Sequence, residues 1–413
     1  MLIVGELRLG GETRSVNGAL AIAMLARSLG KKALLLPAHN GKEAAATSGI
    51  DVIAIDSLKD AVAYFRNPAT VSPVSSYLSS ELFRSVPAPV DFADIRGQAH
   101  VKRAMEITAA GGHNALMLGP PGSGKTMIAK ALIGILPELT PDEALVVTKI
   151  HSINGLLPEG QSIVTQRPFR SPHHTISYAG LIGGGMIPRP GEVALAHSGI
   201  LFLDELPEFP RAVLEVLRQP LEDRKVTISR ANGNFCFPTN FICIAAMNPC
   251  PCGLLGHPDR PCRDTSLQIE RYRSKISGPL LDRIDLHIEV PALRYHDLLE
   301  AEGGEESQII RKRVQKARER QKKRLGEMRT NSLLTSAELR FHCTLNSECK
   351  EVLRQAIDIM GISARACDRL IRVARTIADL AEEEQIHRLH LMEALAFRSS
   401  PLEKQPPQRL NLC

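Results

Sequence analysis

The hydrophobic residues of this chain fall into short continuous runs that alternate with segments of helical periodicity. Apolar runs at 115–118, 200–203 and 241–247 are typical of buried strands. A helix-forming segment at 127–134 follows the first run closely. The alternation predicts an α/β domain.

A smaller α/β pattern occupies residues 1–66. Asn17 is the expected N-cap of its first helix, and Ser57 that of its second. Residues 67–90 are rich in Pro and Ser, which predicts a linker. The expected strands lie at 2–4, 6–9, 32–36 and 52–55, and the expected helices at 17–29 and 57–66.

Helical periodicity dominates the last part of the chain. Residues 310–325 place apolar side chains at helical spacing with many Lys and Arg residues between them. Such a basic face is either solvated or a nucleic-acid surface, and the sequence leaves both readings open. Ser363 is the expected N-cap of a later helix, whose Arg369, Arg372 and Arg375 are expected at the surface or at an interface. That helix is expected at 363–380, and further helices at 336–343, 346–359 and 390–397.

These patterns divide the chain into five parts. We expect an α/β unit at 1–66, a linker at 67–90, a larger α/β domain at 91–293, a helical domain at 294–400 and a tail at 401–413.

The segment between the run at 115–118 and its helix reads G-x-x-x-x-G-K-T. Glycines let the backbone fold closely around an anion, and the next helix presents the positive end of its dipole. Lys125 is expected to reach the β- and γ-phosphates of ATP, and Thr126 to ligate Mg²⁺. In P-loop ATPases the segment that corresponds to residues 92–98 of this chain usually contacts the adenine. The loop residues are Gly119, Pro120, Pro121, Gly122, Ser123, Gly124, Lys125 and Thr126.

Polar residues end the two later apolar runs. Asp204 follows the run at 200–203 and stands where a carboxylate holds the Mg²⁺ shell, and Glu205 can orient and polarise the attacking water. Asn248 ends the run at 241–247 and can hydrogen-bond the γ-phosphate or the water. The pattern therefore predicts ATP hydrolysis.

Two arginines stand in suggestive positions. The alternating residues at 226–237 predict a β-hairpin with Arg230 near its tip. Arg283 is flanked by Asp282 and Asp285, which predicts a surface ion pair within one subunit. The alternative role of Arg283 is an arginine finger that reaches a neighbour's nucleotide, an effect of roughly 10³–10⁵ in rate.

A cysteine-rich segment follows Asn248. Cys250, Cys252 and Cys262, with His257 or Asp264 as a fourth group, have spacing that suits Zn²⁺. A reduced, metal-free loop explains the pattern at least as well.

The composition predicts the compartment of the protein and limits the kinds of partner that it binds. The 9 Cys, the lack of a secretory signal and the lack of a membrane-spanning apolar run predict a reduced, cytoplasmic protein without a membrane partner. The net charge of +6 is compatible with nucleic acid, and aromatic residues are only 4% of the chain. Any contact with nucleic acid is therefore expected to rely on charge more than on base stacking.

Five segments carry a resemblance to a known family. They read PFRSPHHT at 168–175, PRPGEVALAH at 188–197, LDELPEF at 203–209, AMNPCPC at 246–252 and SGPLLDRID at 277–285. With them, residues 91–397 resemble the magnesium-chelatase-like AAA+ proteins, most closely the ComM/YifB competence family.

The resemblance implies an AAA+ P-loop core with a parallel sheet and a C-terminal helical lid, working as a homo-oligomeric ring, a hexamer. It makes Asn248 the sensor-1 residue, Arg283 the arginine finger and Arg365 the sensor-2 arginine. It places the hairpin toward the central pore, where Arg230 would meet DNA. ComM-like proteins are ATP-driven DNA motors that move branched recombination intermediates during natural transformation.

The sequence departs from the family's pattern in its N-terminal unit and in its cysteine segment. Residues 1–66 are similar to the second half of the family's Lon-protease-like N-terminal domain, so the first half is expected to be missing. The stretch at 16–20 lacks the catalytic lysine of Lon-type sequences, and we expect no peptidase activity. Asp264 stands where the family's cysteine cluster ends in Cys, which weakens the zinc interpretation.

Other classes of function stay open at this point. A chelatase-type motor that drives metal insertion into porphyrin shares nearly the whole AAA+ pattern, although residues 1–66 and the cysteine cluster argue against it. A remodelling or binding protein would use ATP only to set its assembly state. A truncated, non-functional product is the remaining alternative.

Overall fold

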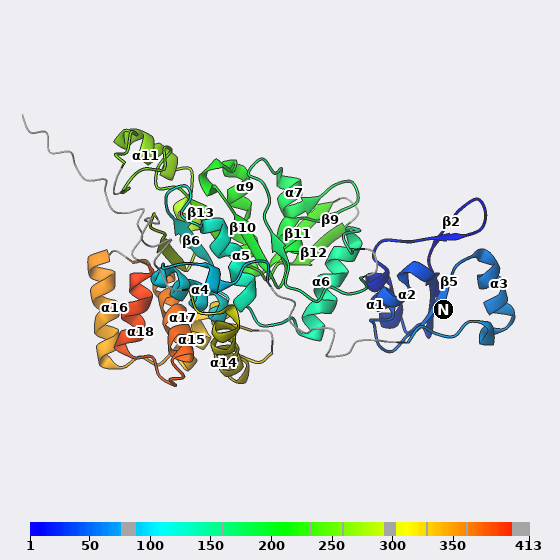
Figure 1. The fold of residues 1–413 in the computed structure, drawn as a ribbon. Helices are drawn as coiled ribbons and strands as arrows, with labels where there is room; N and C mark the ends of the chain where they lie inside the picture. The colour runs from blue at the N-terminus through cyan, green and yellow to red at the C-terminus, as the bar shows by residue number, and fades with distance from the viewer. Residues whose placement is uncertain are drawn as a thin grey trace, which may run out of the picture.

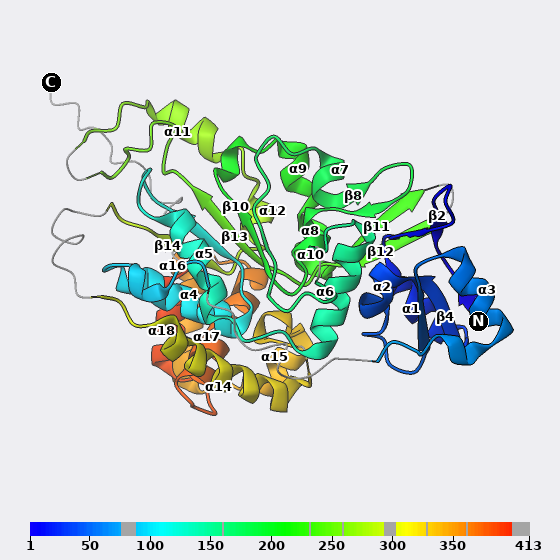
Figure 2. The same ribbon diagram turned by 45° about the vertical axis from the view of Figure 1, so that its right-hand side comes forward.

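The computed structural model describes residues 1–75, 88–158, 161–230, 233–257, 260–292, 303–327, 329–360 and 362–398. A central domain surrounds a five-stranded sheet, with a small α/β unit on one side and a helical domain on the other (Figures 1 and 2). Part of the expected linker and the whole expected tail at 401–413 lie outside the described residues.

The five strands of the central sheet are all parallel, in the order β14-β6-β13-β10-β7. The three apolar runs of the sequence form strands, as predicted, and these strands lie in the middle of the sheet. The short edge strand β7 carries no such run, and its pattern did not predict it. The strands are β6 (Ala115–Leu118), β7 (Phe169–Arg170), β10 (Ile200–Leu203), β13 (Ile242–Met247) and β14 (Leu286–Glu289).

Alternate side chains of these strands enter two separate cores, because successive residues of a strand point to opposite faces. Met117, Phe202 and Ile244 pack with α4 and α5 on one face. Leu116, Leu201 and Cys243 pack on the other face, with α9, α10 and a β-hairpin at 225–238. The helices of the domain are α4 (Ala99–Gly111), α5 (Lys125–Ile135), α6 (Pro141–Ile153), α7 (Tyr178–Ile182), α8 (Glu192–Leu195), α9 (Arg211–Val216), α10 (Arg218–Asp223), α11 (Ser266–Arg273) and α12 (Gly278–Leu281).

Two β-hairpins project from the second face. The predicted hairpin is formed by β11 (Lys225–Arg230) and β12 (Gly233–Pro238), and Arg230 pairs with Gly233 at its end. A second hairpin, β8 (Gly183–Gly184) with β9 (Arg189–Pro190), was not predicted. Its strands are too short to show an alternating pattern.

The N-terminal unit has a three-stranded parallel sheet in the order β1-β4-β5. Ser57 caps α3 as predicted, but Asn17 does not cap α1. The N-cap of α1 is Gly18, whose φ of 81° places it in the left-handed region. The elements are β1 (Leu2–Ile3), β2 (Glu6–Leu7), β3 (Thr13–Arg14), α1 (Ala19–Ser28), β4 (Ala33–Pro37), α2 (Ala38–Ala44), β5 (Asp51–Ile55) and α3 (Leu58–Arg66).

A buried carboxylate joins the N-terminal unit to the central domain. Glu43 accepts hydrogen bonds from the backbone N–H of Leu20 at 2.8 Å and from the Ser152 hydroxyl at 2.5 Å. The same hydroxyl accepts from the N–H of Gly18 at 2.9 Å. Since Ser152 belongs to α6, these bonds dock the unit on the central domain.

The helical domain packs directly on α4 and α5 and shares their hydrophobic core. Ser363 caps α17 as predicted. Among the described residues no helix combines the length and the apolar character needed to cross a bilayer. The helices are α14 (Ser307–Leu325), α15 (Ser336–His342), α16 (Ser347–Met360), α17 (Ala364–Leu380) and α18 (Arg388–Ala396).

Much of the basic face of α14 is part of the fold. Arg318 donates to the carbonyl of Ala109 at 2.7 Å, and burial lowers the pKa of its guanidinium. Arg313 is paired with Glu106 at 2.5 Å. These contacts favour the structural reading of the basic helix over the nucleic-acid surface.

Arg375 is buried, so its expected position at a surface or interface was wrong. Its side chain is 1% exposed, pairs with Asp379 at 3.1 Å and donates to the carbonyls of residues 383 and 384. Arg324 holds the other oxygen of Asp379 at 2.5 Å. One buried carboxylate therefore neutralises two arginines from different helices.

Replacing Asp379 with Ala leaves two buried cations without their counter-charge. We expect Asp379→Ala to cost about 3–5 kcal/mol and to lower the unfolding midpoint of the helical domain in a thermal melt. Asp358→Ala is the matched control, because its carboxylate is 60% exposed and pairs with Arg354 at 3.5 Å. The control should change stability by less than about 1 kcal/mol. Equal melting of both variants would contradict the central role of Asp379.

Candidate nucleotide-binding site

The predicted site residues follow the carboxyl ends of three neighbouring strands. Leu118 of β6 is paired in register with Met247 of β13, and Leu203 of β10 with Ala245. The glycine loop, Asp204 and Asn248 therefore leave the sheet at the same edge, where ligands of open α/β sheets bind.

The glycine loop has the backbone of a phosphate cradle. Gly122 and Gly124 have φ angles of 76° and 87°, which favour glycine. The helix α5 begins directly after them at Lys125, so its unpaired N–H groups face the loop. Gln98 donates its side-chain N–H to the carbonyl of Ser123 at 3.1 Å, which ties the segment at 92–98 to the loop.

Lys125 lies among the oxygens that surround this loop. Its Nζ donates to the carbonyls of Gly119 and Pro120 at 2.7 and 2.8 Å and to Asn248 Oδ1 at 3.3 Å. Burial lowers the pKa of the Lys125 ammonium, and the charges of Asp204 and Glu205 offset part of this shift. The contact with Asn248 joins the end of β13 to the loop after β6.

Thr126 and the acidic pair form the second half of the site. The Thr126 hydroxyl donates to Asp204 Oδ2 at 2.9 Å, and the N–H of Glu205 donates to Oδ1 at 3.0 Å. The carboxylate is thus oriented through both oxygens. A hydroxyl beside a carboxylate is a hard oxygen donor set that suits Mg²⁺, so these residues fit the expected metal.

Glu205 has a strained backbone and an unexpected neighbour. Its φ of 51° is in the left-handed region, which is uncommon for a residue with a side chain. Glu205 Oε2 lies 3.5 Å from His174 Nδ1. The ring of His174 contacts His173 with centroids 4.0 Å apart and the edge of Phe209 at 6.4 Å.

His174 was not predicted as a site residue, although it lies in the segment at 168–175 that carried the resemblance. A histidine in a loop has no periodicity that relates it to a carboxylate 31 positions later. The adjacency of β7 and β10 brings the two together.

Two predicted arginines lie away from these contacts. Arg283 pairs with Glu222 and donates to the carbonyl of Pro279 at 2.7 Å. Its pairing with a flanking carboxylate was wrong, because Asp285 is buried and binds Arg369 at 2.9 Å. Arg365 is exposed in the first turn of α17. The finger role of Arg283 and the sensor-2 role of Arg365 stay predictions.

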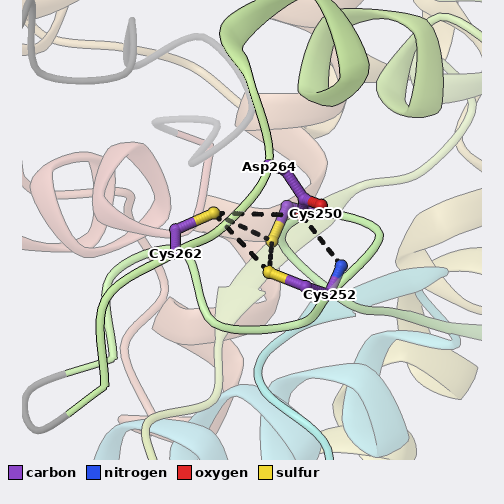
Figure 3. A group of neighbouring side chains, drawn as sticks. All are labelled: Cys250, Cys252, Cys262 and Asp264. Atoms are coloured by element: carbon purple, nitrogen blue, oxygen red, sulfur yellow. Dashed lines mark hydrogen bonds between the residues drawn. The ribbon is translucent and has the colours of Figure 1, made fainter.

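The cysteine cluster does assemble beside this site. The three sulfur atoms of Cys250, Cys252 and Cys262 and the carboxylate of Asp264 lie within 4.8 Å of one another (Figure 3). His257, the alternative fourth group, is not among them.

Comparisons with known proteins show which sequences this chain resembles. Residues 91–298 match the family model described as magnesium chelatase, subunit ChlI, and residues 304–398 match its C-terminal model. The chain is 44% identical over 401 residues to the competence protein ComM of Haemophilus influenzae, covering 96% of this chain and 77% of that protein. It is 41% identical over 404 residues to the uncharacterised protein YifB of Escherichia coli, covering 96% and 77%. An uncharacterised protein of Mycobacterium tuberculosis is 39% identical over 405 residues, covering 97% and 78%.

The contact between His174 and Glu205 predicts that His174 positions the Glu205 carboxylate. His174→Ala should lower kcat for ATP by up to about 100-fold with little change in KM, because a displaced base costs rate but not binding. His174→Asn should keep most of the rate, since its amide N–H can occupy the place of Nδ1. Steady-state kinetics of both variants test this. Equal loss in both, or a change confined to KM, would show that His174 does not position Glu205.

Proposed function

Because the chain belongs to the ComM/YifB family of magnesium-chelatase-like AAA+ proteins, we propose that it is an ATP-hydrolysing motor that moves branched DNA during natural transformation. The observation that carries the ATPase part is the assembly of Lys125, the Thr126–Asp204 pair and Asn248 at one sheet edge. The DNA part is supported by the similarity to a competence protein and by the two hairpins.

The residues of the site have separate tasks in this proposal. Lys125 and the loop N–H groups bind the β- and γ-phosphates, and Thr126 with Asp204 would hold Mg²⁺. Mg²⁺, when bound, neutralises phosphate charge that builds up as the bond to the leaving group breaks. Glu205 accepts a hydrogen bond from the attacking water and aligns it. Asn248 holds the water or the γ-phosphate at the required distance.

A ring of subunits, a hexamer, completes the site. Arg283 would leave Glu222 and reach the nucleotide of a neighbouring subunit, where its charge stabilises the transition state. Glu222 is 51% exposed, whereas the Arg283 side chain is 10% exposed, so Arg283 would have to leave a largely buried position to reach a neighbour. Arg365 would approach the same phosphate from the helical domain.

The hairpins are the proposed DNA-contacting elements. Arg230 is exposed at the end of β11, and a Cβ added to Gly184 in the other hairpin would stand 3.4 Å from Arg230 Nη2. Met186 and Ile187, between β8 and β9, are 96% and 74% exposed. A cation beside apolar side chains suits a strand of DNA, whose phosphates attract charge and whose bases offer apolar faces.

A chelatase-type motor is the second candidate, favoured by the description of the matching family models. The similarity to the competence protein covers 96% of the chain and so includes most of the N-terminal unit. That breadth of similarity weighs in favour of the DNA motor.

Substitutions in the site separate binding from turnover. Lys125→Ala should abolish nucleotide binding or turnover, because the phosphate charge loses its partner. Glu205→Gln should leave ATP binding intact and lower kcat by about 10²–10⁴-fold, since an amide is a poor base. Fluorescent-nucleotide binding and phosphate release measure the two effects. Normal hydrolysis by either variant would overturn the assigned roles.

The test of the DNA motor is ATP turnover with and without single-stranded and branched DNA at two salt concentrations. Strong stimulation that weakens with salt supports the motor, because salt competes with phosphate contacts. Turnover that ignores DNA and responds to a porphyrin-binding partner would favour the chelatase. Ring assembly with ATP but negligible hydrolysis would favour a remodelling or binding protein.

Arg230 is the hairpin residue to change. Arg230→Ala should weaken DNA stimulation and lower the salt slope of DNA affinity by about 1, because the variant has one cation fewer to pair with a phosphate. Lys323→Ala is the matched control, because this exposed lysine lies on the basic helix α14. Loss of stimulation in the Lys323 variant alone would move the DNA surface from the hairpin to α14.

A further inference from the structure

Three thiols and one carboxylate meet in a small space at the end of β13. The distances between the sulfur atoms are 3.4 Å from Cys250 to Cys252 and 3.6 Å from each of these to Cys262 (Figure 3). Asp264 Oδ2 lies 3.8 Å from the sulfur of Cys262 and accepts the backbone N–H of Cys252 at 2.8 Å. Two separate segments supply the four groups: the turn after β13 and the residues before α11.

These distances are those of a tetrahedral metal site. With Zn–S bonds of about 2.3 Å, two sulfur ligands at the corners of a tetrahedron stand about 3.8 Å apart. A disulfide would hold two sulfurs at about 2.05 Å instead. All three sulfur–sulfur distances are close to the tetrahedral edge and nearly equal. The carboxylate oxygen occupies the region of the fourth corner.

We propose that Cys250, Cys252, Cys262 and Asp264 bind one Zn²⁺. Thiolates select Zn²⁺ over Mg²⁺ and Ca²⁺, and a carboxylate oxygen is an accepted fourth ligand of zinc. Four protein ligands close the coordination shell, which marks a structural rather than a catalytic zinc. The structure thus assigns to Asp264 the corner that the sequence alone had made doubtful.

The proposed site is attached to the nucleotide loop. Cys250 is two residues from Asn248, which contacts Lys125. Gly253 lies in the same turn and packs so closely that a Cβ there would stand 2.5 Å from the ring of Pro121. On the other side, Arg273 of α11 donates to the carbonyl of Pro249 at 3.3 Å.

Zinc therefore fastens the β13–α11 connection against the glycine loop and holds Asn248 in place. Without metal, the four groups are held to one another by S–H and N–H hydrogen bonds, which are weaker than bonds to zinc. We expect metal loss to lower ATP turnover by loosening Asn248. This consequence rests on the proposed function, whereas zinc binding itself does not.

The first measurement is the metal content of the full-length chain, purified without chelator, by inductively coupled plasma mass spectrometry. We expect about one Zn²⁺ per chain. Cys252→Ser and Asp264→Asn should both lose most of it, whereas Asp264→Cys, which completes a four-thiolate site, should keep it. Cys236→Ser is the matched control, because Cys236 is exposed on the hairpin and should not affect metal content.

A second measurement, thiol alkylation, uses the wild-type chain and so does not depend on the folding of a variant. Alkylation of the wild-type chain should spare Cys250, Cys252 and Cys262 until a chelator is added, while Cys236 reacts at once. A chain that stays free of metal after incubation with Zn²⁺, or cluster thiols that react equally with and without chelator, would overturn the site. Zinc retained by Asp264→Asn at full stoichiometry would overturn the role of Asp264. Stoichiometric zinc with turnover that ignores DNA would leave the site standing and refute the motor.

Discussion

The parallel register of β6, β13 and β10 is the constraint on which the site depends. It aligns Leu118 with Met247 and Leu203 with Ala245, so that the residues after each strand emerge together. A slip of one residue would turn every buried side chain to the other face of the sheet. The two cores, each fed by alternate residues, therefore fix the register that brings Lys125 to Asn248 and Thr126 to Asp204. Packing energy spread over two cores positions four polar groups.

This dependence explains what the sequence could predict. Strands buried on both faces read as continuous apolar runs, and the residues that end such runs must lie at one sheet edge. Asp204, Glu205 and Asn248 were predicted from the ends of such runs, and Lys125 from the glycine-loop motif that follows another. The edge strand β7 and the β8–β9 hairpin have two residues per strand and no readable pattern. The neighbour of Glu205, His174, is reached only through β7 and was therefore missed.

Arginines were the least predictable residues. Their pattern in α14 and α17 is that of an amphipathic surface, yet Arg318 is half-buried on a backbone carbonyl, and Arg375 is buried and bound to two carbonyls and a carboxylate. A long arginine side chain can turn back into the core when a hydrogen-bond acceptor lies there. The periodicity of one helix gives no information about acceptors on other helices. Arg283 shows the same limit, since its partner Glu222 is 61 residues away and the adjacent Asp285 serves Arg369 instead.

The fourth group of the cysteine cluster could likewise not be identified from the sequence. Spacing alone left His257 and Asp264 as equal candidates, because a loop can bring either to three thiols. The fold decides between them through the backbone: the N–H of Cys252 binds Asp264 and holds its carboxylate at the sulfurs. A turn that packs its Gly253 against Pro121 cannot move without disturbing the nucleotide loop. The cysteine cluster and Asn248 are therefore coupled. Any bond that makes the cluster more rigid also restricts the movement of Asn248, which contacts Lys125.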